Sequence, residues 1–315
     1  MVAVVPVPEC PVCGQREAAE HALGFDYEYR TCRNCWRFMR CIDCGHVRLD
    51  PRPATSELAV IYPPDYYAYH YESRINPLAV RAKRWLDRQK MRAVLRAASG
   101  PPAAYLDVGC GTGRFLELMH EWGVAKERLF GIELDATTVE RLQRKGYQAL
   151  SGRVEACESI DDGSLDLVTM FHVIEHVEDP GAVVEKITRW LRPGGILAVE
   201  TPNADSQDAR AFADSYWGGY HIPRHFNLFC AASLGRLCQE RGLSVERVAY
   251  QPGHAFWMYS FNHLLRYGAA PHPRLARLFD PFRSLPPLAL FTLYDTIRAR
   301  LGGRTSAMLM VLKKR

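Results

Sequence analysis

The chain has 315 residues, of which 48% are hydrophobic and 24% are charged, and its formal net charge is +5. These values exclude a disordered chain and fit one large folded domain or two modest ones. The charge is too small to indicate nucleic acid or an anionic membrane as a partner, and it permits an acidic substrate without requiring one.

The N-terminal segment MVAVVPVPEC has neither the charged region nor the long apolar core of an export signal. No later run reaches the roughly 18 apolar residues that a membrane-spanning helix needs. We therefore expect a soluble, cytoplasmic protein without a transmembrane segment. In that compartment, cysteines gathered near the N-terminus indicate metal binding rather than disulfides.

Three CxxC pairs occur before residue 45. The outer two pairs are each followed directly by a glycine, and their spacing lets two thiolates hold one metal, so that together they complete a tetrahedral site. The prolines of DPRP, residues 50–53, fix the backbone and mark the end of this module. We predict a zinc-binding module over residues 1–53, with Zn²⁺ held by Cys10, Cys13, Cys41 and Cys44.

The middle pair, Cys32 and Cys35, is not needed for a site with four ligands. Two idle thiols, a disulfide and a redox pair all stay open for it. The other four cysteines are scattered singly and are expected in the core: Cys110, Cys157, Cys230 and Cys238.

Residues 54–100 are predicted as a tyrosine-rich linker, IYPPDYYAYHYES, followed by a helix over Pro77–Ala98 with one basic face. The tyrosines could cover or line a ligand site, or pack between modules. After this helix, short apolar runs alternate with amphipathic segments, which indicates a parallel sheet covered by helices. The predicted strands are Ala104–Val108, Leu129–Leu134, Leu165–Phe171, Gly195–Glu200 and Leu243–Tyr250.

The stretch YLDVGCGTGRF, residues 105–115, joins the first of these strands to a helix through three alternate glycines. A Walker loop would end in GK[ST], and the dinucleotide fingerprint would need glycine in place of Arg114, so neither matches. Asp107 at the strand end would repel a pyrophosphate and attract a cation. S-adenosylmethionine fits, because it carries an ammonium and a sulfonium and no phosphate. Glu133 ends the second strand, where nucleotide sites place an acid for the ribose hydroxyls.

Four motifs follow one another between residues 104 and 203: LDVGCGTGRF, GIELD, DLVTMFHVIEHVEDP and LRPGGILAVETPN. In these motifs the chain resembles the class I S-adenosylmethionine-dependent methyltransferases, particularly a broad bacterial group that carries HVIEH after the fourth strand. The cysteine segment, which ends in CxxCGHVRLDPRP, is similar to the N-terminal zinc-binding module of several sugar and natural-product methyltransferases.

The resemblance implies an α/β fold with a Rossmann-like, seven-stranded methyltransferase sheet. Residues 101–260 would form the cofactor-binding domain, and residues 305–315 would add its antiparallel last strand. Residues 261–304 are predicted as a helical insertion before that strand. This insertion could be a lid, a dimer contact or a membrane-surface patch, and the oligomeric state is left open.

The resemblance also implies which residues hold the cofactor. The glycine loop and Asp107 would hold its amino-acid end, Glu133 its ribose and the segment Gly152–Glu155 its adenine, with His172 as a wall of the pocket. The predicted cofactor-binding residues are Asp107, Gly109, Gly111, Gly113, Glu133, Leu134, Val154, Glu155 and His172.

Methyl transfer needs the reactants in line and a base for the acceptor's proton. Glu175 and His176 follow a strand and are candidates, although support of the next helix is the preferred interpretation. In similar methyltransferases a histidine near the acceptor lies in the stretch that corresponds here to YWGGYHIPRHFNLFC, residues 216–230. We therefore rank His225 first and His221 second as the general base, while simple anchoring of the loop by both stays open.

The sequence thus predicts an S-adenosylmethionine-dependent methyltransferase that acts on a small or nucleotide-linked acceptor, such as a sugar or a secondary-metabolite intermediate. The alternative is an RNA methyltransferase that grips nucleic acid with the zinc module and the basic helix. The weak net charge and the absence of an Asn/Asp-Pro-Pro-aromatic motif disfavour it. A zinc-ribbon binding protein with a vestigial cofactor fold is disfavoured too, because the cofactor-binding motifs are intact.

Overall fold

The computed structural model describes residues 1–63, 77–98 and 100–315, and four of the five tyrosines of the linker motif lie outside this part. The chain forms two compact units. The first contains residues 1–80, 201–234 and 249–308, and the second contains residues 81–200, 235–248 and 309–315. The boundaries fall within α3, β10, α8, β12 and β13.

The second unit is built on a seven-stranded mixed sheet with the strand order β12-β13-β10-β9-β6-β7-β8. Its central neighbours β10, β9, β6, β7 and β8 run parallel. This confirms the predicted methyltransferase fold. The strands are β6 (Tyr105–Val108), β7 (Leu129–Glu133), β8 (Gln148–Ser151), β9 (Leu165–Phe171), β10 (Leu191–Pro202), β12 (Leu243–Gln251) and β13 (Ala307–Lys314).

The bounds of these strands agree with the sequence patterns except at two places. Strand β8 was not predicted, because its four residues, QALS, carry too short an apolar signal. Strand β10 begins at Leu191, four positions before the predicted start, and its register against β9 shifts between Leu191 and Ile196. The predicted strand began only at Gly195, because Pro193 and the glycine pair interrupt the apolar run before it.

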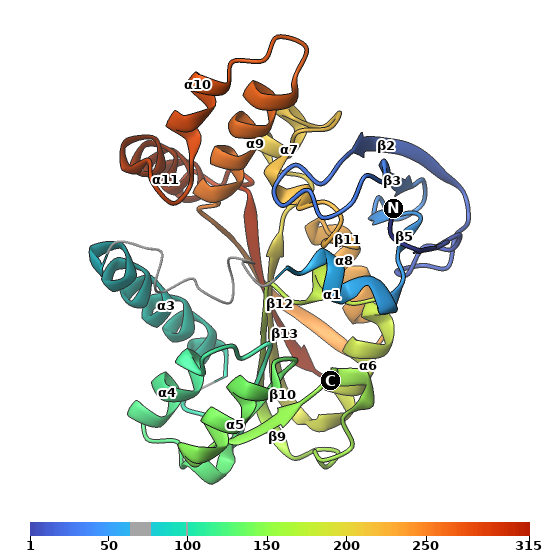
Figure 1. Cartoon of the computed structure of the whole chain (residues 1–315). Helices are drawn as coiled ribbons and strands as arrows, with labels where there is room; N and C mark the ends of the chain where they lie inside the picture. The colour runs from blue at the N-terminus through green and yellow to red at the C-terminus, as the bar shows by residue number, and fades with distance from the viewer. Residues whose placement is uncertain (64–76, 99) are drawn as a thin grey trace. The chain divides into compact units, whose positions relative to one another are not determined.

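Helices cover both faces of this sheet: α4 and α5 lie on one side and α6 on the other (Figure 1). Asp135 and Asp179 cap α5 and α6, since each carboxylate accepts a hydrogen bond from a backbone N–H three residues later. The helices are α3 (Pro77–Ala97), α4 (Arg114–Glu121), α5 (Ala136–Arg144), α6 (Pro180–Trp190) and α8 (Ala231–Gln239), with 3₁₀ turns η3 (Lys126–Arg128), η4 (Val154–Ala156) and η5 (Ile174–His176).

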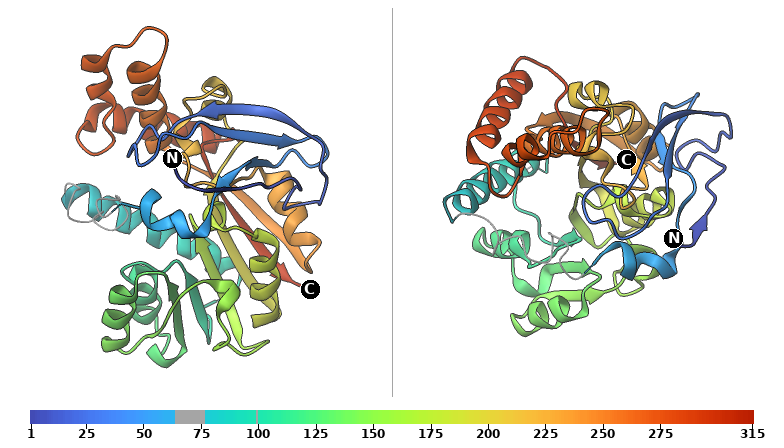
Figure 2. Two further views of the ribbon diagram at one scale, coloured as in Figure 1. Left: turned by 45° about the vertical axis from the view of Figure 1, so that its right-hand side comes forward. Right: turned by 45° about the horizontal axis from the view of Figure 1, so that its top comes forward.

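The first unit contains the cysteine module, where β2 (Ala18–Gly24) and β3 (Trp36–Cys41) run antiparallel side by side (Figure 2). Strand β4 (Val47–Leu49) pairs with β3, and β11 (Asn227–Leu228) pairs with β4. The strand β11 comes from the loop that was predicted to carry the general base. A short ladder joins β1 (Val4–Val5) to β5 (Arg52–Pro53).

Helices complete the first unit: η1 (Thr55–Glu57), α1 (Leu58–Ile61), α7 (Gln207–Ala211), η6 (Gly218–Tyr220), α9 (His254–Tyr267), α10 (Pro273–Ala276), η7 (Arg277–Phe279) and α11 (Leu285–Arg300). Helix α9 has Gly253 as its N-cap and extends across Phe261, the predicted start of the helical insertion. Aromatic side chains from the cysteine module, the loop and α9 share one core. The predicted domain boundaries stay a prediction.

Candidate functional site

The glycine loop leaves β6 at its carboxyl end, the edge of a parallel sheet where ligands bind. Gly109, Gly111 and Gly113 all have positive φ, at 70°, 49° and 86°. Residues with a side chain rarely adopt this backbone conformation, so the turn itself requires glycine at these positions. Helix α4 then begins at Arg114, directly after the loop.

The three glycines differ in what surrounds them. A Cβ at Gly109 would lie 2.5 Å from Val173 Cγ2, and one at Gly113 would lie 2.4 Å from Leu142 Cδ2. A Cβ at Gly111 would meet nothing within 4 Å. Packing within the protein therefore requires glycine at positions 109 and 113. Gly111 instead exposes its backbone to open space, where a ligand can approach.

Asp107 is a buried carboxylate near the end of β6, with 3% of its surface exposed. Thr169 of β9 donates a hydrogen bond of 2.7 Å to its Oδ1, and the Tyr105 hydroxyl contacts the same threonine. Burial raises the pKa of Asp107 to about 7, although the hydrogen bond from Thr169 and the charge of Arg114 oppose this shift. The carboxylate therefore gains or loses its charge near neutral pH.

Glu133 ends β7 beside the glycine loop. Its carboxylate accepts hydrogen bonds from the backbone N–H of Gly111 at 2.9 Å and of Leu134 at 2.7 Å. These bonds hold the acid against the open glycine, so that Gly111 and Glu133, two of the predicted cofactor-binding residues, lie together. Leu134 itself is 64% exposed.

The predicted adenine segment follows β8 and forms the 3₁₀ turn η4. Val154 is buried, and Glu155 is partly buried. The backbone carbonyl of Glu155 accepts a hydrogen bond of 2.9 Å from Lys186 of α6, which ties the turn to that helix. Cys157 follows the turn and is only partly buried, as is Cys230, so their assignment to the core is wrong, while Cys110 and Cys238 are buried.

His172 follows β9 in a left-handed conformation, with φ of 55°, and its side chain is 44% exposed. Its Nδ1 lies 3.2 Å from Glu175 Oε1, and its Nε2 lies 3.9 Å from Glu200. Burial alone would lower the pKa of His172, but the two carboxylates raise it above its usual value. Glu175 is fully buried in η5 next to His176, and its carboxylate orients the His172 ring.

The two candidate bases lie in the first unit, in the loop around η6. The Nδ1 of His225 lies 2.8 Å from the carbonyl of Gly219, and the Nδ1 of His221 lies 2.8 Å from Glu28 Oε1. Each histidine is 6% exposed, and their rings contact each other edge to face with centroids 5.0 Å apart.

Arg224 lies in the same loop and is fully buried. Its guanidinium donates hydrogen bonds of 3.1 and 3.0 Å to the two oxygens of Asp26. Asp26 and Glu28 were not predicted from the sequence, because both contact loop residues more than 190 positions away. The only local signal is the alternation of acids with aromatic residues in FDYEYR, residues 25–30.

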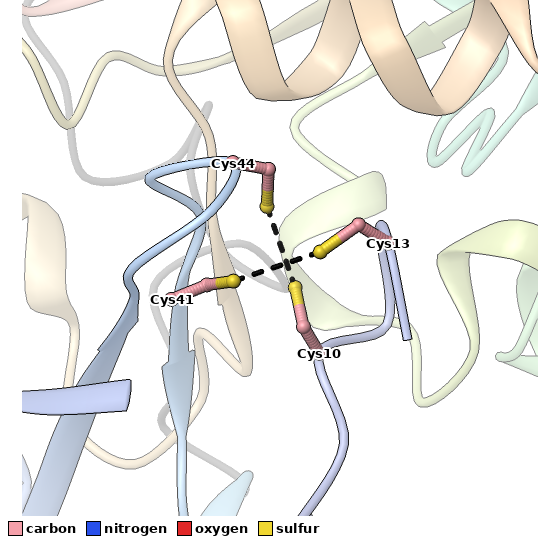
Figure 3. Close-up of side chains that lie close together, drawn as sticks. All are labelled: Cys10, Cys13, Cys41 and Cys44. Carbon is pink, nitrogen blue, oxygen red and sulfur yellow. Dashed lines mark hydrogen bonds between the residues drawn. The ribbon is translucent and has the colours of Figure 1, made fainter. Parts of the chain in front are cut away.

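The sulfurs of the outer CxxC pairs point toward one another (Figure 3). Cys10 Sγ lies 3.5 Å from Cys44 Sγ, Cys13 Sγ lies 3.6 Å from Cys41 Sγ, and all four sulfurs lie within 4.8 Å of one another. Gly14 and Gly45 turn the chain after each pair, with φ of 74° and 70°. Cys32 and Cys35 lie outside this cluster and are not joined by a disulfide.

The fold and the loop geometry agree with the comparisons with known proteins. Residues 82–248, more than half of the chain, match a family described as a methyltransferase domain. The chain therefore belongs to this family and is an S-adenosylmethionine-dependent methyltransferase.

Curated relatives include ubiquinone biosynthesis O-methyltransferases of Xanthomonas. The protein of Xanthomonas euvesicatoria pv. vesicatoria (strain 85-10) is 30% identical over 210 residues, which cover 58% of this chain and 86% of that protein. The protein of Xanthomonas oryzae pv. oryzae (strain PXO99A) is 30% identical over 172 residues, covering 49% of this chain and 70% of that protein.

Solved structures share the fold. A chain of the complex between the Haloferax volcanii Trm112 methyltransferase activator and a methyltransferase matches with a TM-score of 0.51 and 16% identity, covering 79% of this chain and 96% of that chain. This likeness shows the fold alone. No helix within residues 1–63, 77–98 and 100–315 has the length and apolar character needed to cross a bilayer.

The different surroundings of the loop glycines give a test of the loop geometry. We expect Gly113→Ala to lower the free energy of unfolding by about 2–5 kcal/mol, because left-handed strain adds to overpacking against Leu142. Gly111→Ala is the matched control and should cost about 1–2 kcal/mol, from strain alone. Urea unfolding of both variants measures the difference, and equal losses would contradict the assigned surroundings.

Proposed function

We propose that the glycine loop and its two acids bind S-adenosylmethionine. The bare backbone at Gly111 gives the cofactor room to lie against the main chain. Asp107 supplies a negative charge for the cationic amino-acid end, and Glu133, already beside Gly111, supplies oxygens for the ribose hydroxyls. Val154, Glu155 and Leu134 are proposed to contact the adenosine, and His172 to form a wall of the pocket.

The acceptor is proposed to be a small or nucleotide-linked molecule, such as a sugar or a secondary-metabolite intermediate, deprotonated by a histidine of the loop at residues 216–230. The observation that carries this proposal is the 30% identity to ubiquinone biosynthesis O-methyltransferases over 86% of the length of one of them. Their name indicates methylation of oxygen on an organic molecule, which favours a hydroxyl acceptor here.

The basic helix gives less support to the RNA alternative than its sequence indicates. Lys90 is 13% exposed and forms an ion pair with Glu200, and Arg88 forms one with Glu121. A cation that is already neutralised by a neighbouring carboxylate contributes little to phosphate binding. Arg81, Arg84 and Arg92 remain exposed on the same helix, and the side chain of Lys83 lies outside the described part.

The proposed acceptor class can be tested with S-adenosylmethionine labelled in its methyl group. We expect label to pass to a component of a nucleic-acid-free small-molecule extract, with catechol and a nucleoside diphosphate sugar as defined probes. Total RNA from the same cells is the competing acceptor. Transfer to RNA alone, with a steep loss of RNA binding as salt rises, would contradict the small acceptor and favour the alternative.

Asp107→Asn should weaken cofactor binding at least tenfold, because the amide carries no charge to attract the cation. The ionised form binds better, so the affinity of the natural protein should rise from about pH 5 to about pH 8 and level off as Asp107 ionises. The asparagine variant should lose this pH dependence. Calorimetry at several pH values measures both effects, and unchanged affinity would refute the assignment.

Ionisation of Asp107 should strengthen cofactor binding as the pH rises, but it should lower the free energy of unfolding. Its pKa of about 7 in the folded chain lies above the ordinary value of 3.8, so the folded state binds the proton more tightly. Its contribution to the free energy of unfolding is complete below about pH 4 and is lost as the pH rises through about 7.

We propose that Cys10, Cys13, Cys41 and Cys44 hold one Zn²⁺. A tetrahedral ion with zinc–sulfur bonds of about 2.3 Å separates its sulfurs by about 3.8 Å, and the closest pairs here lie 3.5 and 3.6 Å apart. Burial raises the pKa of Cys13 to about 11 in the absence of metal. Metal binding would therefore have to displace the thiol proton.

Elemental analysis should find about one zinc per chain. Cys13→Ser should lose the metal and lower the melting temperature, since metal binding is coupled to folding of the site. Cys35→Ser is the matched control and should keep both the zinc and the melting temperature. A folded, metal-free natural protein, or loss of zinc from the control, would contradict the proposed ligand set.

A further inference from the structure

We propose that helix α11 docks the protein on the surface of an anionic lipid bilayer. An apolar stripe of this helix enters the lipid, and arginines of the same segment bind the headgroup phosphates. The stripe consists of Leu290, Leu293, Ile297 and Leu301, whose exposed fractions run from 47% to 81%. The inference goes beyond the proposed function, because no step of the methyl transfer enters it.

The four stripe residues lie on one face of α11. They follow one another at intervals of three, four and four positions, which is the spacing that aligns side chains along a helix. Pro286, four positions before Leu290, is also exposed and extends the stripe. The helix therefore exposes an apolar face along most of its length.

The opposite face of α11 is fixed within the first unit. Phe291 stacks on Trp257 of the neighbouring helix α9, with ring centroids 5.5 Å apart (Figure 1). Asp295 is fully buried and accepts hydrogen bonds from the backbone N–H of Gly253 at 3.0 Å and from Trp257 Nε1 at 3.2 Å. A rotation of the helix that buried the stripe would break these bonds and expose Phe291.

A helix that is apolar on all its faces is normally buried on all of them. Here one apolar face is packed and the other is exposed to solvent. Exposed apolar surface of this kind marks a site of interaction with a protein or a membrane.

The positive charge of the chain is concentrated in the same segment. Residues 261–304 contain seven arginines, two aspartates and no lysine or glutamate, so their formal net charge is +5. This equals the net charge of the whole chain, and the remaining residues are therefore formally neutral together. The whole-chain value is too small to indicate a membrane, but its concentration in one segment is not.

Most of these arginines are available to an external anion. Arg298 pairs with Asp295, and Arg304 pairs with Asp205. The other five are exposed and have no ion-pair partner in the described part of the chain: Arg266, Arg274, Arg277, Arg283 and Arg300.

The two acids of the segment do not oppose an anionic surface. Asp295 is buried, and Asp280 is partly buried, with its Oδ1 accepting a hydrogen bond of 2.9 Å from the backbone N–H of Phe282. Residues 261–304 thus present arginine and leucine to solvent without an exposed carboxylate. Helix α10 and the turn η7 repeat this combination, since Leu275 and Leu278 are exposed there too.

An anionic bilayer matches both parts of this surface. Leucine side chains lower their free energy in the boundary between headgroups and acyl chains, and arginines are attracted to the lipid phosphates. An isologous dimer would place the surface against its own copy and bring two sets of unpaired arginines together. A nucleic acid would neutralise the arginines, but it would leave the leucine stripe without an apolar partner.

Sedimentation of the full chain with lipid vesicles tests the proposal without any methyl acceptor. We expect at least tenfold tighter binding to phosphatidylcholine vesicles that contain phosphatidylglycerol than to pure phosphatidylcholine vesicles. This binding should weaken as the salt concentration rises, because salt screens the attraction of the arginines. A chain that does not bind the anionic vesicles would overturn the proposal.

The apolar part is tested by Leu290→Ser combined with Leu293→Ser. This pair should lower the affinity for the anionic vesicles at least tenfold, because two side chains that enter the lipid are shortened and made polar. Leu23→Ser combined with Val60→Ser is the matched control, since both residues are exposed in the same unit. The control should bind normally, and equal losses in the two pairs would contradict docking through α11.

The charged part is tested by Arg274→Gln combined with Arg277→Gln. We expect at least tenfold weaker binding to the anionic vesicles and a smaller dependence on salt. Arg33→Gln combined with Arg128→Gln removes the same charge from two exposed arginines elsewhere and should change binding at most about twofold. Loss in the Arg274 and Arg277 pair with normal binding of the leucine pair would indicate a site for soluble anions or nucleic acid and overturn the proposal.

A fluorescent reporter shows whether the stripe enters the lipid. The tryptophan added by Leu293→Trp should be quenched by vesicles with brominated acyl chains, whereas the one added by Leu23→Trp should not. The absence of quenching at position 293 would overturn the proposal. So would a dimer in sedimentation velocity that dissociates in the Leu290 and Leu293 pair, because the stripe would then be an interface between two copies of the chain.

Discussion

The sharp turn after β6 is the constraint on which the cofactor site depends. The backbone must take positive φ at three alternate positions to leave the sheet and enter α4. Two of these positions are also closed by Val173 and Leu142, so packing inside the protein already requires glycine there. Gly111 alone of the three faces open space, and the carboxylate of Glu133 is bonded to its N–H. A single turn thus satisfies the fold and exposes backbone for a ligand.

Three buried carboxylates show how surroundings set the chemistry of one functional group. Burial dominates at Asp107, whose pKa rises to about 7. Asp26 is held by a permanent cation and stays ionised. Glu28 is also ionised, but its direct partner is a histidine. A carboxyl group therefore titrates near neutrality at one position and stays ionised at the two others, according to the partners that the fold brings to it.

The cysteine module is more than an attached metal-binding segment. Its sheet is completed by β11, which comes from the segment after β10, and its core is shared with aromatic residues of that segment. Asp26 and Glu28, which lie between the two outer cysteine pairs, reach Arg224 and His221. If the four cysteines bind zinc, the metal also stabilises the segment that carries Asp26 and Glu28.

The sequence alone determined the features that depend on neighbours along the chain. The strand, glycine turn and helix around Asp107 are local, as are the CxxC spacing and most strand bounds, so their periodicity and residue types were enough to predict them. Two features with weak local signals were not predicted. Strand β8 is too short to give a clear pattern, and Pro193 interrupts the apolar run at the beginning of β10.

Tertiary structure decided whatever joins distant parts of the chain. Arg224 is fully buried and bonds to Asp26, 198 positions away in the sequence. Glu28 likewise contacts His221, 193 positions away in the sequence. No sequence pattern records such pairs, because burial and partner choice arise only when the chain packs. Those two quantities set the charge of each acid and histidine, and hence what each can do.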